Sequence, residues 1–291
     1  MRASLLFINK SFWKSLFNVL FSFGIPAVFI CASCLSWNLF GGTISSVLVF
    51  PSVSYISIVF ISLVVIPTII FEYRTSNILR RIEDAGNKKI SFIWAMSIFF
   101  GLLFIANYFF NCAVGTLCMF NNFQVHIMWD TANYGAVFYT LILTIILCTT
   151  IGITIGINAK SLIFIQVFGI SFILISVFLA YWIIPVQLLT AEPNYNAIRF
   201  ISYLWPLKYI SNLFTQSWLQ TASFNIFHVS PFDFGSSYAS SLWVVYPDDS
   251  QKTFFDILNV PDKIADIFAP LAWIVVLFGV NYAFYKYQRR T

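Results

Sequence analysis

The chain has 291 residues, a net charge of +5, 59% hydrophobic residues and only 9% charged residues. Because average soluble domains carry about 25% charged residues, this composition excludes a water-soluble globule and predicts a membrane protein.

The N-terminal segment predicts a short helix over residues 2–14. Leu5, Ile8 and Phe12 recur at helical spacing, while Lys10 and Lys14 fall elsewhere on the helix. This pattern is typical of a helix lying in the inner membrane interface, with an ordinary basic tail as the alternative. The apolar run that follows is too long for a cleavable signal core of about 7 to 15 residues, so we expect an uncleaved span.

Stretches without Asp, Glu, Lys or Arg locate the membrane spans, because a charge at the bilayer centre costs about 2.5 to 3.5 kcal/mol. Five such stretches contain 57, 40, 29, 31 and 19 residues, beginning after Lys14, Lys89, Asp130, Lys160 and Asp266. A span needs about 20 apolar residues, so the first stretch holds two helices and each other stretch holds one. The six expected spans are Leu16 to Trp37, Val53 to Phe71, Phe92 to Cys118, Tyr134 to Ile157, Leu162 to Ile184 and Ala269 to Tyr285. Continuous apolarity without period-two alternation favours helices over barrel strands.

The basic residues predict the orientation, since short cytoplasmic loops collect Lys and Arg. With both termini inside, the inner segments contain 12 of the 16 basic residues and three acids, giving +9, while the outer segments sum to −4. The positive charge is therefore explained by topology, and nucleic acid is not an expected partner. We expect a multi-pass protein of the cell membrane with both termini in the cytoplasm.

The sequence contains no phosphate loop, no HExxH and no GxSxG motif, so it predicts neither an enzyme nor a directly bound cofactor or metal. All five cysteines fall in or at the ends of expected spans. The CxxC spacing of Cys31 and Cys34 lacks a second pair or nearby histidines, so packing cysteines are expected. Gly152 and Gly156 form a GxxxG that favours close helix packing.

Three amides lie inside expected spans. Asn107 and Asn111 are one turn apart in the third span, and Gln166 lies in the fifth. Amides in lipid usually bond to neighbouring helices, and a place on a substrate path is the functional alternative.

The segment from Phe71 to Lys89 carries five basic and three acidic residues between charge-free runs. Phe71, Thr75, Ile78 and Ile82 share one helical face with Leu79 beside them. Arg74, Asn77 and Arg81 share the opposite face, which predicts an amphipathic cytoplasmic helix. An ordinary basic loop on anionic lipid is the alternative.

The order of residues in this segment resembles a sequence motif of a known protein family. The relevant positions are Glu72, Arg74, Ile78, Leu79, Arg80, Arg81 and Ile82. They are similar to the inner loop E-R-x-x-G-T-L-x-x-L of the type-2 ABC exporter permeases, with Ser76 and Asn77 replacing Gly-Thr. After the fifth span, Pro185, Trp205, Pro206 and Tyr209 resemble the outer proline and N-P-L-x-Y turn of the same family, with Trp205 replacing Asn.

The resemblance implies one permease domain over residues 1–291, with an inner coupling loop at 72–90 and an outer insert at 188–268. It implies short re-entrant helices between spans five and six, acting as an outer gate. It also implies a partner ATPase that supplies ATP and Mg, docked on the loop helix, and a second permease copy or paralogue within membrane lipids. The expected function is export of a hydrophobic or amphipathic substrate. A non-transporting regulatory or immunity protein, or an ATP-independent transporter, remains the alternative.

Overall fold

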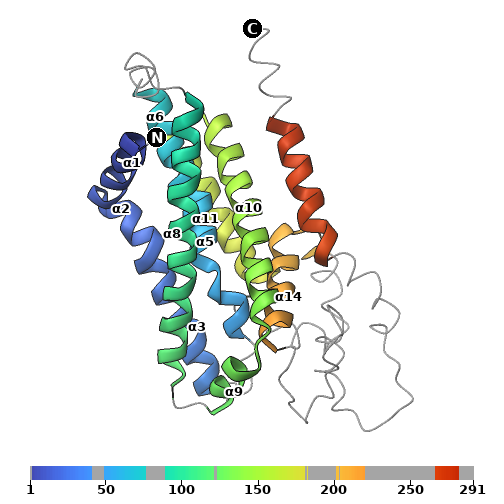
Figure 1. The fold of residues 1–291 in the computed structure, drawn as a ribbon. Coiled ribbons are helices and arrows are strands. Elements are labelled where there is room, and N and C mark those ends of the chain that lie inside the picture. The colour runs from blue at the N-terminus through green and yellow to red at the C-terminus, as the bar shows by residue number, and fades with distance from the viewer. Residues whose placement is uncertain are drawn as a thin grey trace.

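A computed structural model describes residues 2–40, 49–76, 89–120, 123–180, 182, 201–202, 204–219 and 266–281. Within these ranges the chain is almost entirely helical and contains no strand (Figure 1). Five helices are long and apolar enough to cross a membrane. They are numbered below as spans one to five: Leu16–Ser36, Val49–Thr75, Trp94–Cys118, Tyr134–Asn158 and Leu162–Leu179. The all-α class is confirmed, and the helices are consistent with a multi-pass membrane protein.

The helical elements follow the expected spans closely. Before and within span one come α1 (Arg2–Lys14), α2 (Leu16–Val19), the π-helical turn η1 (Leu20–Gly24) and α3 (Ile25–Phe40). Span two combines residues 49–54, α5 (Ile56–Phe60), the π-helical turn η2 (Ile61–Val65) and α6 (Ile66–Thr75). Then come α8 (Lys89–Cys118), α9 (Phe123–Thr131), α10 (Tyr134–Asn158), α11 (Leu162–Leu179) and α14 (Pro206–Leu219).

The sixth expected span is described only over Asp266–Asn281, an apolar helix of 16 residues, and the residues after it lie outside the described ranges. Hydrogen bonds hold this helix at both ends. Asn212 of α14 donates to Asp266 at 3.1 Å, and Asn281 donates to Thr154 of α10 at 2.9 Å. At about 24 Å, the described part is shorter than the 30 Å hydrocarbon core, so a sixth span stays a prediction.

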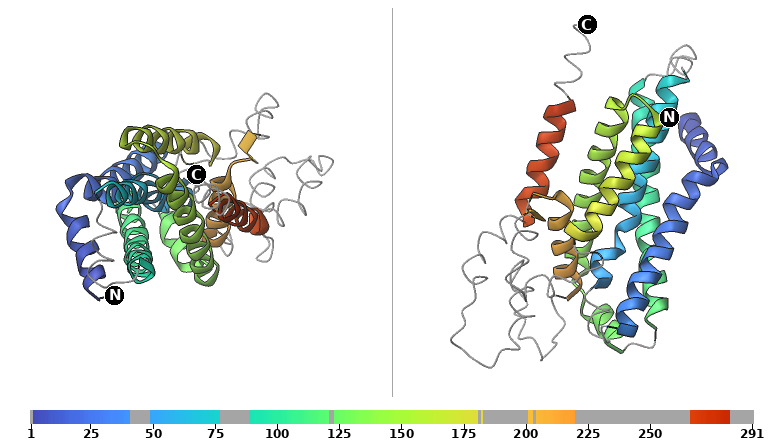
Figure 2. Two further views of the ribbon diagram at one scale, coloured as in Figure 1. Left: turned by 90° about the horizontal axis from the view of Figure 1, so that it is seen from above. Right: turned by 180° about the vertical axis from the view of Figure 1, so that it is seen from behind.

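Span two is the centre of the bundle. Of its most apolar 18 residues, 94% are buried inside the protein, against 28% in each of spans one and five. It contacts α3, α8, α10 and α11, which surround it in the view from above (Figure 2). A helix that is apolar on all sides and enclosed in this way forms the core of the fold.

Glycines allow spans four and five to approach the backbone of span two. A Cβ atom added at Gly152 would lie 2.1 Å from the carbonyl oxygen of Ser62, and one at Gly169 would lie 2.6 Å from that of Leu63. A Cβ atom added at Gly156 would lie 3.0 Å from the Cα of Pro67, a less severe but still close contact. The expected packing role of the GxxxG in span four is confirmed.

The two π-helical turns have one local cause. Each directly precedes an Ile-Pro pair, Ile25-Pro26 after η1 and Ile66-Pro67 after η2. Proline lacks a backbone N–H and its ring clashes with the carbonyl four residues earlier. Widening the preceding turn relieves this clash without ending the helix. The two turns also contact each other, so spans one and two are distorted at the same place.

The predicted N-terminal helix is present as α1, and its expected apolar face is the buried one. Ile8 and Phe12 are fully buried, and the Phe12 ring packs edge-on against Phe99 of α8 at 5.5 Å. The helix ends before Ser15, whose hydroxyl accepts from the Asn18 backbone N–H and begins α2. The α1 helix is thus anchored on α8.

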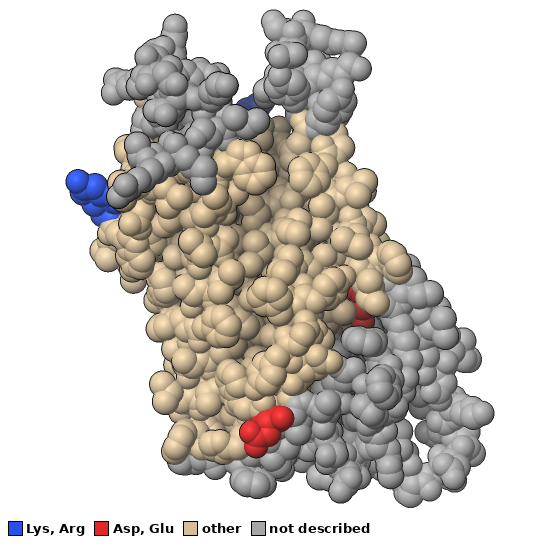
Figure 3. Space-filling model, viewed as in Figure 1, with Lys and Arg blue, Asp and Glu red and all other residues tan. Residues whose placement is uncertain are grey.

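The described charged side chains differ between the two ends of the bundle, being mostly basic at one end and mostly acidic toward the other. The end containing α1, the last turn of α6 and the α10–α11 turn is called the α1 end, and the opposite one the α9 end (Figure 1). Described charged side chains at the α1 end are Lys10, Lys14, Glu72, Arg74 and Lys160. Those in the half containing α9 are Asp130, Lys208 and Asp266. A broad band without charged residues separates the basic and acidic side chains on the face shown in Figure 3.

Candidate functional site

At the α1 end, span two finishes in the two charged residues that begin the expected coupling loop. Glu72 and Arg74 are both exposed on the last turn of α6. The Arg74 guanidinium donates to the carbonyl oxygens of Ile157 and Ala159, at the C-terminus of α10. Terminal carbonyls of a helix lack intrahelical partners, and a positive charge is favourable there. Arg74 therefore ties span two to the turn between spans four and five.

The remaining coupling residues, Ile78, Leu79, Arg80, Arg81 and Ile82, lie outside the described residues. The amphipathic cytoplasmic helix, and its role in coupling, therefore stay predictions. The structure does describe the turn that leads into this segment. Through Arg74, the last turn of α6 is hydrogen-bonded to the C-terminus of α10.

In the middle of the bundle, the two asparagines of α8 are fully buried. Asn111 donates to the backbone oxygen of Ser54 at 3.0 Å and to the hydroxyl of Ser57 at 2.6 Å, so it joins span three to span two. Asn107 donates back to Leu103 in its own helix. The side-chain carbonyl oxygens of Asn107 and Asn111 have no hydrogen-bond partner among the described residues.

Gln166 lies elsewhere. It is half-buried on α11, a helix that packs against η2, α6 and α14. The structure thus gives the two asparagines a common place beside span two and puts the glutamine on a different helix. Their substrate-path role stays a prediction.

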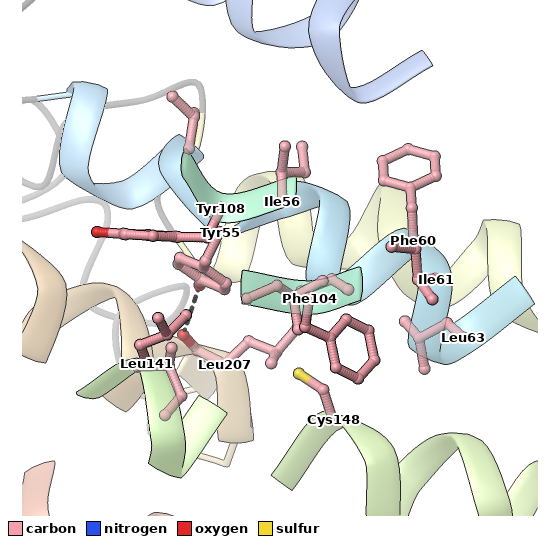
Figure 4. Close-up of a cluster of buried hydrophobic side chains, with 14 of the residues drawn as sticks. Tyr55, Ile56, Phe60, Ile61, Leu63, Phe104, Tyr108, Leu141, Cys148 and Leu207 are labelled. Atoms are coloured by element: carbon pink, nitrogen blue, oxygen red, sulfur yellow. Dashed lines mark hydrogen bonds between the residues drawn. The ribbon is translucent and has the colours of Figure 1, made fainter. Parts of the chain in front are cut away.

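In the half of the bundle that contains α9, α14 packs against a cluster of aromatic and hydroxyl side chains around Tyr55. Tyr55 is fully buried in a turn that interrupts span two. Its ring stacks on Phe214 of α14 at 5.1 Å, and its hydroxyl lies 3.1 Å from the carbonyl oxygen of Leu207 (Figure 4). The Nε1–H of Trp182 donates to the same hydroxyl at 2.9 Å.

These contacts form a connected chain of hydrogen bonds. Ser211 donates to the carbonyl oxygen of Ala180 at 2.6 Å, and the hydroxyl oxygens of Tyr55 and Ser211 lie 2.7 Å apart. The chain runs through Trp182, Tyr55, Ser211 and Ala180 and joins spans two and five through α14. Because a buried hydroxyl without a partner costs about 1–3 kcal/mol, each member of this chain helps to fix the others.

The C-terminal end of α14 is held by a second group of aromatic and hydroxyl side chains. The Nε1–H of Trp218 donates to the Tyr108 hydroxyl of α8 at 3.0 Å, and its ring lies edge-on to Trp129 of α9 at 4.7 Å. The hydroxyl oxygens of Thr215 in α14 and Ser52 in span two also lie within hydrogen-bond distance, at 3.2 Å. Thus α14 contacts spans two and three and α9 along its length.

The expected outer-gate residues fall at the start of α14. Trp205 donates to the Ser176 hydroxyl of α11 at 2.9 Å and packs on Phe172, and Pro206 is the first residue of α14. Tyr209 is buried, and Pro185 lies outside the described residues. Three of the four are therefore placed in or beside one helix.

Sequence reasoning missed the aromatic residues that hold α14, namely Tyr55, Tyr108, Trp182 and Trp218. A signal was present: Ser211 and Thr215 lie one turn apart, and serines recur at Ser52, Ser54 and Ser57. Hydroxyls at such spacing inside apolar helices indicate a polar contact between helices. Among the described residues, no group of three His, Cys, Asp or Glu side chains could hold a metal ion.

Comparison of the chain with models of known protein families, with curated proteins and with solved structures gave no match.

Proposed function

We propose that the chain is the membrane subunit of an exporter powered by a separate ATPase, moving a hydrophobic or amphipathic substrate out of the cytoplasm. In this proposal six spans cross the cell membrane, both termini are cytoplasmic, and α14 is a re-entrant outer gate. A second copy or a paralogue completes the pathway, and ATP and Mg bind only to the ATPase.

The observation that best supports this proposal is the position of span two. One of its ends carries Glu72 and Arg74, directly before the charged segment expected to meet the ATPase. Its other half binds α14 through Tyr55. A displacement at the α1 end would thus act, through one central helix, on the contacts that hold α14. Transport by switching between packing arrangements requires such a mechanical link.

One feature supports mobility in this helix. The turn at Tyr55 interrupts span two in its outer part, next to α14. The direction of span two can change there, whereas η2, near its middle, is held by the close glycine contacts of spans four and five.

The test is affinity purification of the tagged chain from its native membranes in a mild detergent, followed by measurement of phosphate release from Mg-ATP. We expect the purified complex to hydrolyse ATP. Arg80→Glu combined with Arg81→Glu should reduce the recovered hydrolysis by about tenfold or more, since reversed charges at an interface cost several kcal/mol.

Lys10→Glu combined with Lys14→Glu is the matched control, because it makes the same charge change on exposed residues of α1 at the same end. It should leave the hydrolysis unchanged. Purified protein without ATP hydrolysis, or equal loss in both variants, would contradict the proposal and favour a membrane protein that does not transport.

A further inference from the structure

Three of the five cysteines lie together where α3 crosses α8. The Sγ atoms of Cys31 and Cys118 are 3.0 Å apart, and both side chains are partly exposed. Cys34, one turn after Cys31, is fully buried beside them. The other two cysteines, Cys112 and Cys148, are buried. Cys31 and Cys118 are therefore both close together and partly exposed on the protein surface.

The close approach results from the packing of two helices. Gly115 lies three residues before Cys118, and a Cβ added there would lie 2.6 Å from the Phe50 ring and 3.4 Å from Cγ2 of Ile30. Ile30 directly precedes Cys31 in α3. The lack of a side chain at Gly115 thus makes room for the Phe50 ring of span two, while Ile30 of α3 packs beside it. Both cysteines are carried by regular helices that contact each other.

We propose that Cys31 and Cys118 are a redox pair that forms a reversible disulfide between spans one and three. A disulfide requires an S–S distance of about 2.05 Å, so the sulfurs must move together by about 1 Å. The sequence predicted only a packing role for the cysteines. In the proposal, Cys31 and Cys118 have a redox role, while Cys112 and Cys148 remain packing residues.

The oxidation is a thiol–disulfide exchange with an external disulfide. One cysteine, as its thiolate, attacks a sulfur of that disulfide and releases one thiolate from it. The second cysteine attacks the resulting mixed disulfide, forming the Cys31–Cys118 bond and releasing the other thiolate. Two protons leave the protein thiols, two electrons pass to the oxidant, and the oxidant becomes two thiols.

The bond would join span one to the last residue of span three, just before α9. Since Trp129 of α9 packs on Trp218 of α14, the link is connected through α9 to the helix that we propose as a gate. In the orientation proposed above, this end faces away from the cytoplasm, where disulfides persist. The chemistry itself does not depend on the transport function.

The test counts oxidised thiols in the full chain. Membranes are lysed and denatured in excess N-ethylmaleimide so that every free thiol is blocked, the excess is removed, the protein is reduced, and the newly freed thiols are labelled with a heavier maleimide before intact mass measurement. One sample is first oxidised with diamide. We expect two heavy and three light labels on the five cysteines of the oxidised protein. Cys31→Ser and Cys118→Ser should each give no heavy label, whereas Cys34→Ser, Cys112→Ser and Cys148→Ser should keep two.

Peptide mass spectrometry of the oxidised wild-type chain should identify Cys31 linked to Cys118, which keeps the test valid if a serine variant fails to fold. No heavy label after diamide treatment would overturn the proposal. Two heavy labels on Cys31→Ser or on Cys118→Ser would overturn it equally, because another pair would then be reacting.

Discussion

The two halves of span two are held by different kinds of contact. Toward the α9 end, Tyr55 binds α14 through a stacked ring and hydroxyl contacts with Leu207 and Ser211. It also accepts a hydrogen bond from the distant Trp182. Toward the α1 end, Gly152 and Gly169 bring neighbouring helices against the backbone of η2. In lipid, the hydrophobic effect does not hold helices together, so both close contact and interhelical hydrogen bonds are used. Span two is held mainly by hydrogen bonds and ring stacking in the half near α9, and mainly by close backbone contact in the other half.

The difference separates a rigid half from an adaptable one. Backbone-to-backbone contacts such as that between Gly152 and Ser62 cannot be exchanged for others without moving a whole helix. Hydrogen bonds among hydroxyl and indole groups can exchange partners by side-chain rotation. We therefore expect conformational change to be concentrated around α14, with the glycine contacts retained.

Gly152→Ala should have the largest effect. The added Cβ would lie 2.1 Å from the backbone oxygen of Ser62, so a helix must shift; such overpacking costs about 3 kcal/mol or more. Thermal unfolding in detergent should show a clear loss of stability. Gly101→Ala is the matched control, because nothing lies within 4 Å of its added Cβ, and alanine favours a helix. Equal unfolding temperatures in the two variants would mean that the close contact is not rigid.

Tyr55→Phe should have an intermediate effect. The ring and its stacking on Phe214 are retained, but the buried Nε1–H of Trp182 loses its acceptor. An unsatisfied buried donor costs about 1–3 kcal/mol. Thermal unfolding should therefore occur at a lower temperature than in wild type, yet above that of Gly152→Ala. Tyr139→Phe removes a hydroxyl from a half-exposed tyrosine of α10 and should be neutral. A neutral Tyr55→Phe would indicate that the half of span two toward the α9 end is held by ring packing alone.

The positions of the helices were predictable because the cost of a charge in lipid does not depend on the fold. Charge-free stretches predicted Val53 to Phe71 where the structure has Val49–Thr75, and Tyr134 to Ile157 where it has Tyr134–Asn158. The packing role of Gly152 was predictable for a similar reason, since a small residue in a membrane helix matters mainly for close approach.

The partners of each helix were not predictable. In lipid, an outward-facing residue is as apolar as a buried one, so spans carry little periodicity to show which face is inside. Tyr55 meets Trp182 across 127 positions of sequence, and Cys31 meets Cys118 across 87. The π-helical turns did have a local signal in Pro26 and Pro67, which span prediction by charge alone ignores.

Arg74→Gln should have the smallest effect and sharpens the comparison at the α1 end. The guanidinium donates to two carbonyl oxygens at the C-terminus of α10, but it is exposed, so the interaction with the helix dipole contributes about 0.3–1 kcal/mol. We expect a small fall in unfolding temperature at low salt that shrinks in about 1 M salt, where charges are screened within about 3 Å. Arg74→Lys keeps the charge but loses the planar fork, so it should lie between wild type and Arg74→Gln. A loss that exceeds that of Tyr55→Phe would mean that polar contacts hold the α1 end as well, and the proposed division of span two would be wrong.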